Sequence, residues 1–216
     1  KCYGPDGGQM TEVPAAKVSA AIETIDLFEP EHLSFEDALA QGLVTYIPDS
    51  VWQDYYTRIA QEAIHPENVR KAGLRVVYSP LCGAGGEPVS EILTRLGAEL
   101  HIPESQRRPS GDFATCPTPN PETDVSFEEN YRLAAEVKPD LVLATDPDSD
   151  RIAAAIPTEN GFRKFTGNEM GCLLLDYILR GLKESGKLPE KPVAVESIVS
   201  TPLAARIAAA HGCEMR

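Results

Sequence analysis

The sequence predicts an α/β fold in which a mixed β-sheet is layered with helices. Short β-rich runs alternate with segments whose apolar residues recur at helical spacing. Gly, Pro and polar residues separate these segments, as expected for turns. One of these turns, Asn160-Gly161, has the composition of a hairpin and joins two strands directly. We therefore expect at least one antiparallel pair within an α/β layer arrangement.

The central elements follow in the order strand, helix, strand, loop. Residues 74–78 form a β-rich run. Residues 89–96 have apolar positions at helical spacing, and Gly97 is placed to end the helix. Residues 98–102 predict the next strand. Residues 103–122, rich in Pro, Gly and polar groups, predict a long loop.

Helix-capping signals place the next elements. Ser126-Phe127-Glu128-Glu129 is a capping-box pattern that predicts a helix through Val137. The apolar run 141–145 then predicts a strand that leads directly into an acidic segment. Residues 152–156 predict another strand, which precedes the hairpin turn.

The last third predicts a second, unfinished α/β unit. Thr166-Gly167-Asn168-Glu169 is a capping box that opens the longest helix. Thr201, followed by Pro202, is expected to cap a later helix that Gly212 ends. Further helices are expected around residues 14–26 and 50–64, and a strand at 193–195. The apolar face of the longest helix is predicted to carry Met170, Leu174, Ile178 and Leu182.

Composition excludes several classes of protein. The chain has 216 residues, 42% of them hydrophobic, so it can build a core. The formal net charge of -13 argues against a nucleic-acid surface, which needs a basic stripe. No apolar run is long enough to span a bilayer. The five cysteines show no CxxC spacing, so a reducing cytoplasm is the expected location.

The acidic segment 146–151 has the composition of a metal site. Asp146, Asp148 and Asp150 stand at alternate positions after an apolar strand, and alternate side chains of an extended segment point to one side. Three such carboxylates repel one another unless a cation binds them. Oxygen ligands without imidazole or thiolate suit Mg²⁺, Mn²⁺ or Ca²⁺.

Three other structures are compatible with an acidic segment of this kind. An EF-hand is excluded, because Arg151 and Pro157 stand where its Gly and Glu are needed. A haloacid-dehalogenase-type phosphatase, with Asp146 as nucleophile and Asp148 as acid/base, stays open as a rival enzyme class. A non-enzymatic α/β module with a solvated acidic loop stays open as well.

Several motifs together resemble one family. Thr145-Asp146-Pro147-Asp148-Ser149-Asp150-Arg151 resembles the metal loop of the α-D-phosphohexomutases (phosphoglucomutases and phosphomannomutases). The other motifs lie in the order the family has them, although Cys82 stands where His or Asn is more usual. They are Lys1-Cys2-Tyr3-Gly4-Pro5, Ser79-Pro80-Leu81-Cys82-Gly83-Ala84-Gly85, Pro119-Asn120-Pro121-Glu122 and Thr166-Gly167-Asn168-Glu169.

The resemblance implies an internal piece of a four-domain enzyme. Residues 1–45 would be the end of domain 1, residues 46–160 a complete domain 2 of the phosphohexomutase type, and residues 162–216 the first half of domain 3. The phosphoserine loop of the family has no counterpart in the chain. We therefore expect the chain alone to be inactive and to act together with the remaining domains of its parent protein.

The resemblance also implies roles for individual residues. Asp146, Asp148 and Asp150 would bind Mg²⁺, and Arg151 would direct its guanidinium at the transferring phosphate. Lys1 would be a general acid/base, and Thr201 would face a phosphorylated hexose substrate. Glucose 1,6-bisphosphate would activate the parent enzyme. Asn120 and Glu122 are expected to fix their loop, and residues 83–86 to form a tight structural turn.

Overall fold

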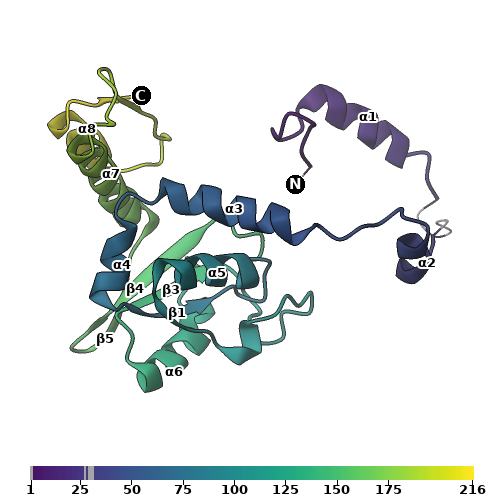
Figure 1. Cartoon of the computed structure of the whole chain (residues 1–216), viewed down its shortest axis with the longest axis horizontal. Helices are drawn as coiled ribbons and strands as arrows, with labels where there is room; N and C mark the ends of the chain where they lie inside the picture. The colour runs from purple at the N-terminus through teal and green to yellow at the C-terminus, as the bar shows by residue number, and fades with distance from the viewer. Residues whose placement is uncertain (1, 27, 29–31) are drawn as a thin grey trace. The chain divides into compact units, whose positions relative to one another are not determined.

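The computed structural model describes residues 2–26, 28 and 32–216. Figure 1 shows the chain, which divides into two compact units, Lys1–Pro48 and Asp49–Arg216. The first unit contains helices α1 (Glu12–Ile22) and α2 (Phe35–Ala40). Ser34 caps α2 by accepting a hydrogen bond from the backbone N–H of Asp37. The second unit contains the remaining helices and the strands.

A five-stranded mixed sheet forms the centre of the second unit, as the sequence predicts. Its order is β2-β1-β3-β4-β5, with β1 parallel to both of its neighbours and antiparallel pairing from β3 through β5. The strands are β1 (Arg75–Ser79), β2 (Glu99–His101), β3 (Leu141–Thr145), β4 (Ile152–Thr158) and β5 (Gly161–Lys164).

The predicted hairpin is present, but its turn lies one residue earlier than expected. Thr158 pairs with Gly161, so the two-residue loop is Glu159-Asn160 and Gly161 already belongs to β5. Gly161 has φ 123°, a conformation that favours glycine. Gly161 is therefore the first residue of β5 and does not lie at the tip of the turn.

Helices cover both faces of the sheet (Figure 1). On one face, Val77 and Val142 pack with Phe127 and with Ala134 of α6 (Glu128–Val137). On the other face, Tyr78 packs with residues that include Val89 and Leu93 of α5 (Gly86–Leu96). Gly97 ends α5 in the left-handed conformation, as predicted. Alternate residues of β1 thus serve two cores, which fixes the register of the strand.

The capping box predicted at Ser126 does not form. A 3₁₀ turn (Val125–Phe127) precedes α6, and Phe127 is the N-cap residue without a side-chain cap. The Ser126 hydroxyl donates to the carbonyl of Thr123 at 2.8 Å instead. Because the chain already turns before the helix, Ser126 cannot take the extended conformation that a capping serine needs.

The capping box at Thr166 does form. Thr166 and Glu169 exchange hydrogen bonds at the start of α7 (Gly167–Glu184). Thr201 caps α8 (Pro202–Ala210), as predicted. The rest of the second unit consists of α3 (Asp49–Glu62), α4 (Pro66–Ala72), the 3₁₀ turn Glu104–Gln106, and the parallel pair β6 (Val193–Ala194) and β7 (Glu214–Met215).

The apolar face predicted for α7 is right at Met170, which packs against the core that contains Tyr78, but wrong at Leu174 and Ile178. Leu174 and Ile178 are 47% and 43% exposed. Leu175 and Leu179 instead pack against the small core around Ala208 of α8. Apolar residues occur on more than one side of α7, so spacing alone could not decide which side α8 covers.

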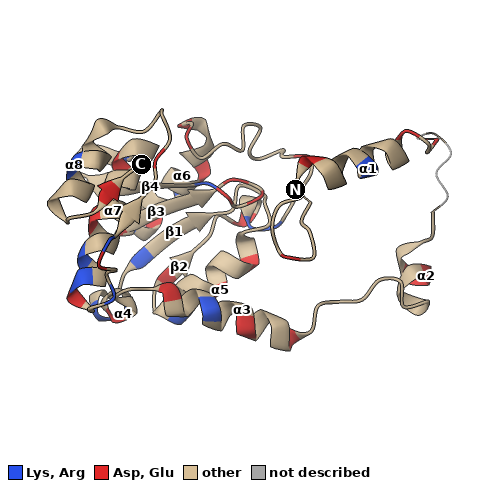
Figure 2. Cartoon of the chain, turned by 90° about the horizontal axis from the view of Figure 1, so that it is seen from above, with Lys and Arg blue, Asp and Glu red and all other residues tan. Residues whose placement is uncertain are grey.

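Charged residues are interspersed on the helices of the second unit. Figure 2 shows both basic and acidic residues along α3, α5 and α7, without one continuous basic stripe on these helices. Among the described residues, no helix combines the length and the apolar character needed to cross a membrane.

The buried phenol of Tyr78 predicts that the fold loses stability at alkaline pH. Its side chain is fully buried and shares a 2.8 Å hydrogen bond with the Thr145 hydroxyl. Burial raises the pKa of Tyr78 to about 12, although the bond with Thr145 opposes the shift. Because the folded-state pKa is raised, its stabilising contribution is complete below pH ~10 and is lost as the pH rises towards ~12.

Urea unfolding at pH 8 to 12 will test this. We expect Tyr78→Phe to lower the free energy of unfolding by about 1–2 kcal/mol at pH 8, because Thr145 loses its partner. The variant should then lose less stability than the unchanged chain between pH ~10 and ~12. Tyr46→Phe, which alters a side chain that is 75% exposed, is the matched control. Parallel alkaline losses in all three proteins would contradict the prediction.

Candidate metal centre

A tight loop of residues 146–151 connects β3 to β4. Thr145 and Ile152 are the last paired residues of the antiparallel strands. The loop is closed by hydrogen bonds from Asp146 N to Arg151 O (3.3 Å) and from Ser149 N to Asp146 O (3.0 Å). Ser149 has φ 60°, a left-handed conformation that costs roughly 1–2 kcal/mol for a non-glycine residue. We call residues 146–151 the acidic loop.

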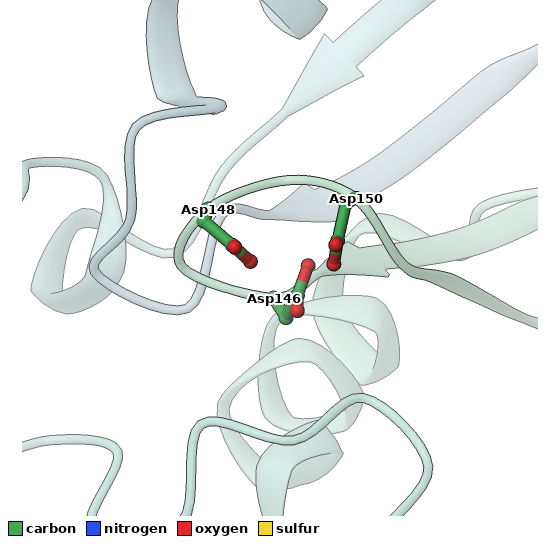
Figure 3. Close-up of side chains that lie close together, drawn as sticks. All are labelled: Asp146, Asp148 and Asp150. Carbon is green, nitrogen blue, oxygen red and sulfur yellow. The ribbon is translucent and has the colours of Figure 1, made fainter. Parts of the chain in front are cut away.

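The acidic loop brings three carboxylates together. One oxygen from each of Asp146, Asp148 and Asp150 lies within 4.8 Å of the others. Figure 3 shows the three side chains directed towards the same space inside the loop. Asp146 is buried, whereas Asp148 and Asp150 are exposed. This set of oxygen donors, open on one side, fits a hard divalent cation such as Mg²⁺.

The route to this convergence differs from the one expected. The alternating aspartates predict an extended segment whose alternate side chains share a side. The structure has a turn instead, reversed at Ser149, so the three side chains point inward around a curve. The alternating sequence still separates the carboxylates, because Pro147 and Ser149 occupy the positions between the three aspartates.

Arg151 balances the buried charge of Asp146. The Arg151 backbone N–H donates to Asp146 Oδ1 at 3.0 Å, and its Nε donates to Oδ2 at 2.9 Å. Burial by itself raises the pKa of Asp146, but the bonds from Arg151 and one with Asp148 outweigh burial and hold the pKa below its usual range. Asp146 is therefore an anion at neutral pH, the state a metal ligand needs.

The Arg151 guanidinium has a second partner. Its Nη1 donates to Asn120 Oδ1 at 3.2 Å, and the same oxygen accepts the backbone N–H of Glu122 at 3.0 Å. The expected loop-fixing role of Asn120 thus extends to the acidic loop. The Arg151 side chain is 47% exposed, so it also keeps a surface towards solvent.

A glycine loop supports the acidic loop from below. Ala84 N donates to Pro147 O at 2.8 Å. A Cβ on Gly83 would lie 2.3 Å from Pro147 Cα, and one on Gly85 would lie 2.5 Å from Ser149 Oγ. The structural turn expected at residues 83–86 therefore needs glycine at these two positions, because Gly83 lies against the backbone of Pro147 and Gly85 lies against the side chain of Ser149.

The remaining predicted site residues are Lys1 and Thr201. Lys1 is outside the described residues. Thr201 caps α8 and lines pockets with Asn168 and Cys172, and its N–H donates to Asn168 Oδ1 at 3.0 Å. No described contact joins Thr201 to the acidic loop.

One feature beside the acidic loop was not predicted from the sequence. A pocket between α3 and α5 has apolar walls that include Trp52 and Tyr55, and it reaches Asp148 and Ser149. The chain's single tryptophan, placed on a helix of mixed polarity, was the available signal.

Known proteins are similar to this chain in sequence. Residues 53–161 match the family described as "Phosphoglucomutase/phosphomannomutase, alpha/beta/alpha domain II". A phosphoglucomutase of Staphylococcus epidermidis is 30% identical over 220 residues, which cover 100% of this chain and 39% of the relative. A phosphomannomutase of Mycoplasmoides pirum is 28% identical over 208 residues, which cover 96% of this chain and 37% of the relative.

Solved structures agree on the fold. A phosphoglucomutase/phosphomannomutase family protein from Burkholderia thailandensis aligns with a TM-score of 0.52 and 17% identity, over 73% of this chain and 32% of that one. A putative phosphomannomutase from Thermus thermophilus aligns with a TM-score of 0.51 and 20% identity, over 74% and 34%. At such identities the likeness shows the fold alone. The chain spans under two fifths of the length of these curated relatives.

The contact between the two loops predicts a severe effect of Gly83→Ala. The added methyl group would overlap the backbone of Pro147, which cannot move without displacing the acidic loop. We expect a loss of about 2 kcal/mol or more in the free energy of unfolding. Large chemical-shift changes at residues 146–151 should accompany the loss.

Gly111→Ala is the matched control. A Cβ at Gly111 meets nothing within 4 Å, so this variant should unfold at or above the denaturant midpoint of the unchanged chain. Equal stabilities for the two variants, measured by urea unfolding, would refute the proposed backbone contact.

Proposed function

The chain belongs to the phosphoglucomutase/phosphomannomutase family, and from this premise we propose that it is part of a Mg²⁺-dependent hexose phosphate mutase. The parent enzyme would interconvert hexose 1-phosphate and hexose 6-phosphate. A phosphoserine outside this chain and a bisphosphorylated sugar would carry the phosphoryl group between the two positions. The observation that carries the proposal is the convergence of three aspartates on one loop of a chain that matches the family.

Within this proposal, the acidic loop is the metal site. Asp146, Asp148 and Asp150 would each give one oxygen to Mg²⁺, which when bound would offset negative charge on the transferring phosphoryl group. Arg151 holds Asp146 in place by two hydrogen bonds. Its exposed face is available to donate to a phosphate oxygen, in line with the preference of guanidinium for phosphate.

Two further roles follow from the family alone. Lys1 would act as a general acid/base on the sugar hydroxyl. Thr201 would contact the hexose phosphate, with its N–H already held by Asn168. Glucose 1,6-bisphosphate would serve as the activator of the parent enzyme.

We propose the same division of the chain that the resemblance implies. Residues 1–45 would end domain 1, residues 46–160 would form domain 2, and residues 162–216 would begin domain 3. The second compact unit begins at Asp49, close to the first proposed boundary, whereas β5 continues the sheet to Lys164, beyond the second. Because relatives are more than twice as long, the chain by itself is proposed to be inactive.

The geometry argues against the rival phosphatase. In that enzyme class Asp146 would attack phosphorus and would need an accessible oxygen. Here Asp146 is 3% exposed, and each of its oxygens accepts a hydrogen bond from Arg151. These contacts suit a fixed ligand better than a nucleophile.

Metal binding can be measured on the chain itself. We expect Mn²⁺, used as a probe for Mg²⁺, to bind in a titration followed by electron paramagnetic resonance. Asp148→Asn should weaken binding by at least about tenfold, because the site loses one of its three negative ligands. Asp112→Asn removes an exposed carboxylate outside the cluster and should leave the affinity unchanged. Equal weakening by both variants would show that Mn²⁺ is attracted by the overall negative charge of the chain and not bound at a specific site.

Catalysis is tested in the full-length protein that contains this chain. With Mg²⁺ and glucose 1,6-bisphosphate present, glucose 1-phosphate should become glucose 6-phosphate, detected with a coupled dehydrogenase. Asp150→Asn should lower kcat by at least about 100-fold, since charge neutralisation supplies several kcal/mol to phosphoryl transfer. Release of inorganic phosphate without isomerisation, together with a fluoroberyllate adduct on Asp146, would contradict the proposed mutase function and support the phosphatase.

A further inference from the structure

A second loop reaches the acidic loop through one side chain. Asn120 lies 31 residues before Arg151, and its Oδ1 accepts both Arg151 Nη1 and the backbone N–H of Glu122. The bond to Glu122 closes a turn within the loop and sets the direction of the amide oxygen. The bond to Arg151 then uses an oxygen whose position is already fixed.

The loop that carries Asn120 is itself anchored to the sheet. The backbone N–H and the hydroxyl of Thr123 both donate to Asn120 O, at 3.0 and 2.9 Å. Lys164 of β5 donates to Glu122 O at 2.7 Å and pairs with Asp124 at 2.8 Å. Pro121 is fully buried. Asn120 is therefore held by the framework of the fold, independently of the acidic loop.

Two contacts fix the plane of the Arg151 guanidinium. A guanidinium is planar and presents its donors in a rigid fork. Nε is directed at Asp146 and Nη1 at Asn120, so both the position and the tilt of the plane are set. With the Asp146 contact alone, the half-exposed side chain could rotate about that one bond.

Other carboxylates also attract the Arg151 guanidinium. Glu122 and Asp150 also act electrostatically on its guanidinium. A neutral amide oxygen at Asn120 selects one orientation without neutralising the charge of Arg151. That charge therefore stays available to Asp146, which is buried and needs a cationic partner.

We propose that Asn120 is a positioning residue: it orients the Arg151 guanidinium, and through Arg151 it orients the Asp146 carboxylate within the cluster of three aspartates. The purpose of this orientation rests on the proposed mutase function. The orientation itself is a property of the chain and can be measured without catalysis.

Nuclear magnetic resonance of the ¹⁵N-labelled chain tests the orientation. The Arg151 Nε–H signal is identified by its absence in Arg151→Lys. In Asn120→Ala we expect its hydrogen exchange to accelerate by at least about tenfold, because the guanidinium loses the Nη1 contact, can rotate, and opens its Nε bond to Asp146 more often. Asn120→Asp keeps an acceptor oxygen at the same place, so slow exchange should be retained.

Thr123→Val separates orientation from general loosening of the loop. It removes the Thr123 hydroxyl bond to Asn120 O and leaves the Asn120 contact with Arg151 in place. Slow exchange at Arg151 in this variant supports the proposal, whereas acceleration equal to that of Asn120→Ala overturns it. If Asn120→Ala does not fold, Asn120→Ser replaces it, since a serine can keep the turn but is too short to reach Arg151. Unchanged exchange in Asn120→Ser would also overturn the proposal.

Kinetics of the full-length protein separate this inference from the proposed function. We expect Asn120→Ala to lower kcat by about tenfold with little change in the KM for hexose phosphate, and Asn120→Asp to recover part of the loss. Faster exchange in a protein without any mutase activity would overturn the proposed function while supporting the positioning role. A wild-type kcat in Asn120→Ala would show that the orientation serves no catalytic purpose and would overturn that part of the inference.

Discussion

The buried carboxylate of Asp146 is the constraint on which the site depends. An ionised carboxylate with 3% exposure is costly unless donors surround it. Arg151 supplies two of these donors from the other end of the same loop, one from its backbone and one from its side chain. The loop must therefore close tightly enough to bring Arg151 back to Asp146. That closure also brings Asp148 and Asp150 inward.

The rest of the unit is arranged so that this closure is stable. Antiparallel pairing of β3 with β4 places both ends of the loop side by side. Gly83 and Gly85 let the preceding loop approach from below, and a side chain at either position would collide with the acidic loop. Asn120, anchored through its own loop to β5, holds the outer side of Arg151. Elements that are distant in the sequence thus all stabilise the closed conformation of the acidic loop.

Part of this arrangement was predictable from local patterns. The order of strands and helices, the mixed sheet, the capping box at Thr166 and the placement of the three aspartates after an apolar strand all follow from residues close together in the sequence. Local patterns failed at Ser126, where a preceding 3₁₀ turn removed the cap, and at the hairpin, where the turn shifted by one residue. In both cases neighbouring backbone geometry overrode a short motif.

The sequence by itself determined which charged groups the candidate site contains, because three carboxylates and an arginine within six residues are a matter of composition and spacing. Only the tertiary structure decided which side of α7 is buried, that Asn120 meets Arg151, and that Gly83 lies under Pro147. The physical reason is the separation in sequence between the residues that interact. Capping and periodicity act over a few residues, whereas the contacts of Asn120 with Arg151 and of Gly83 with Pro147 join residues 31 and 64 positions apart and depend on how the sheet packs its layers.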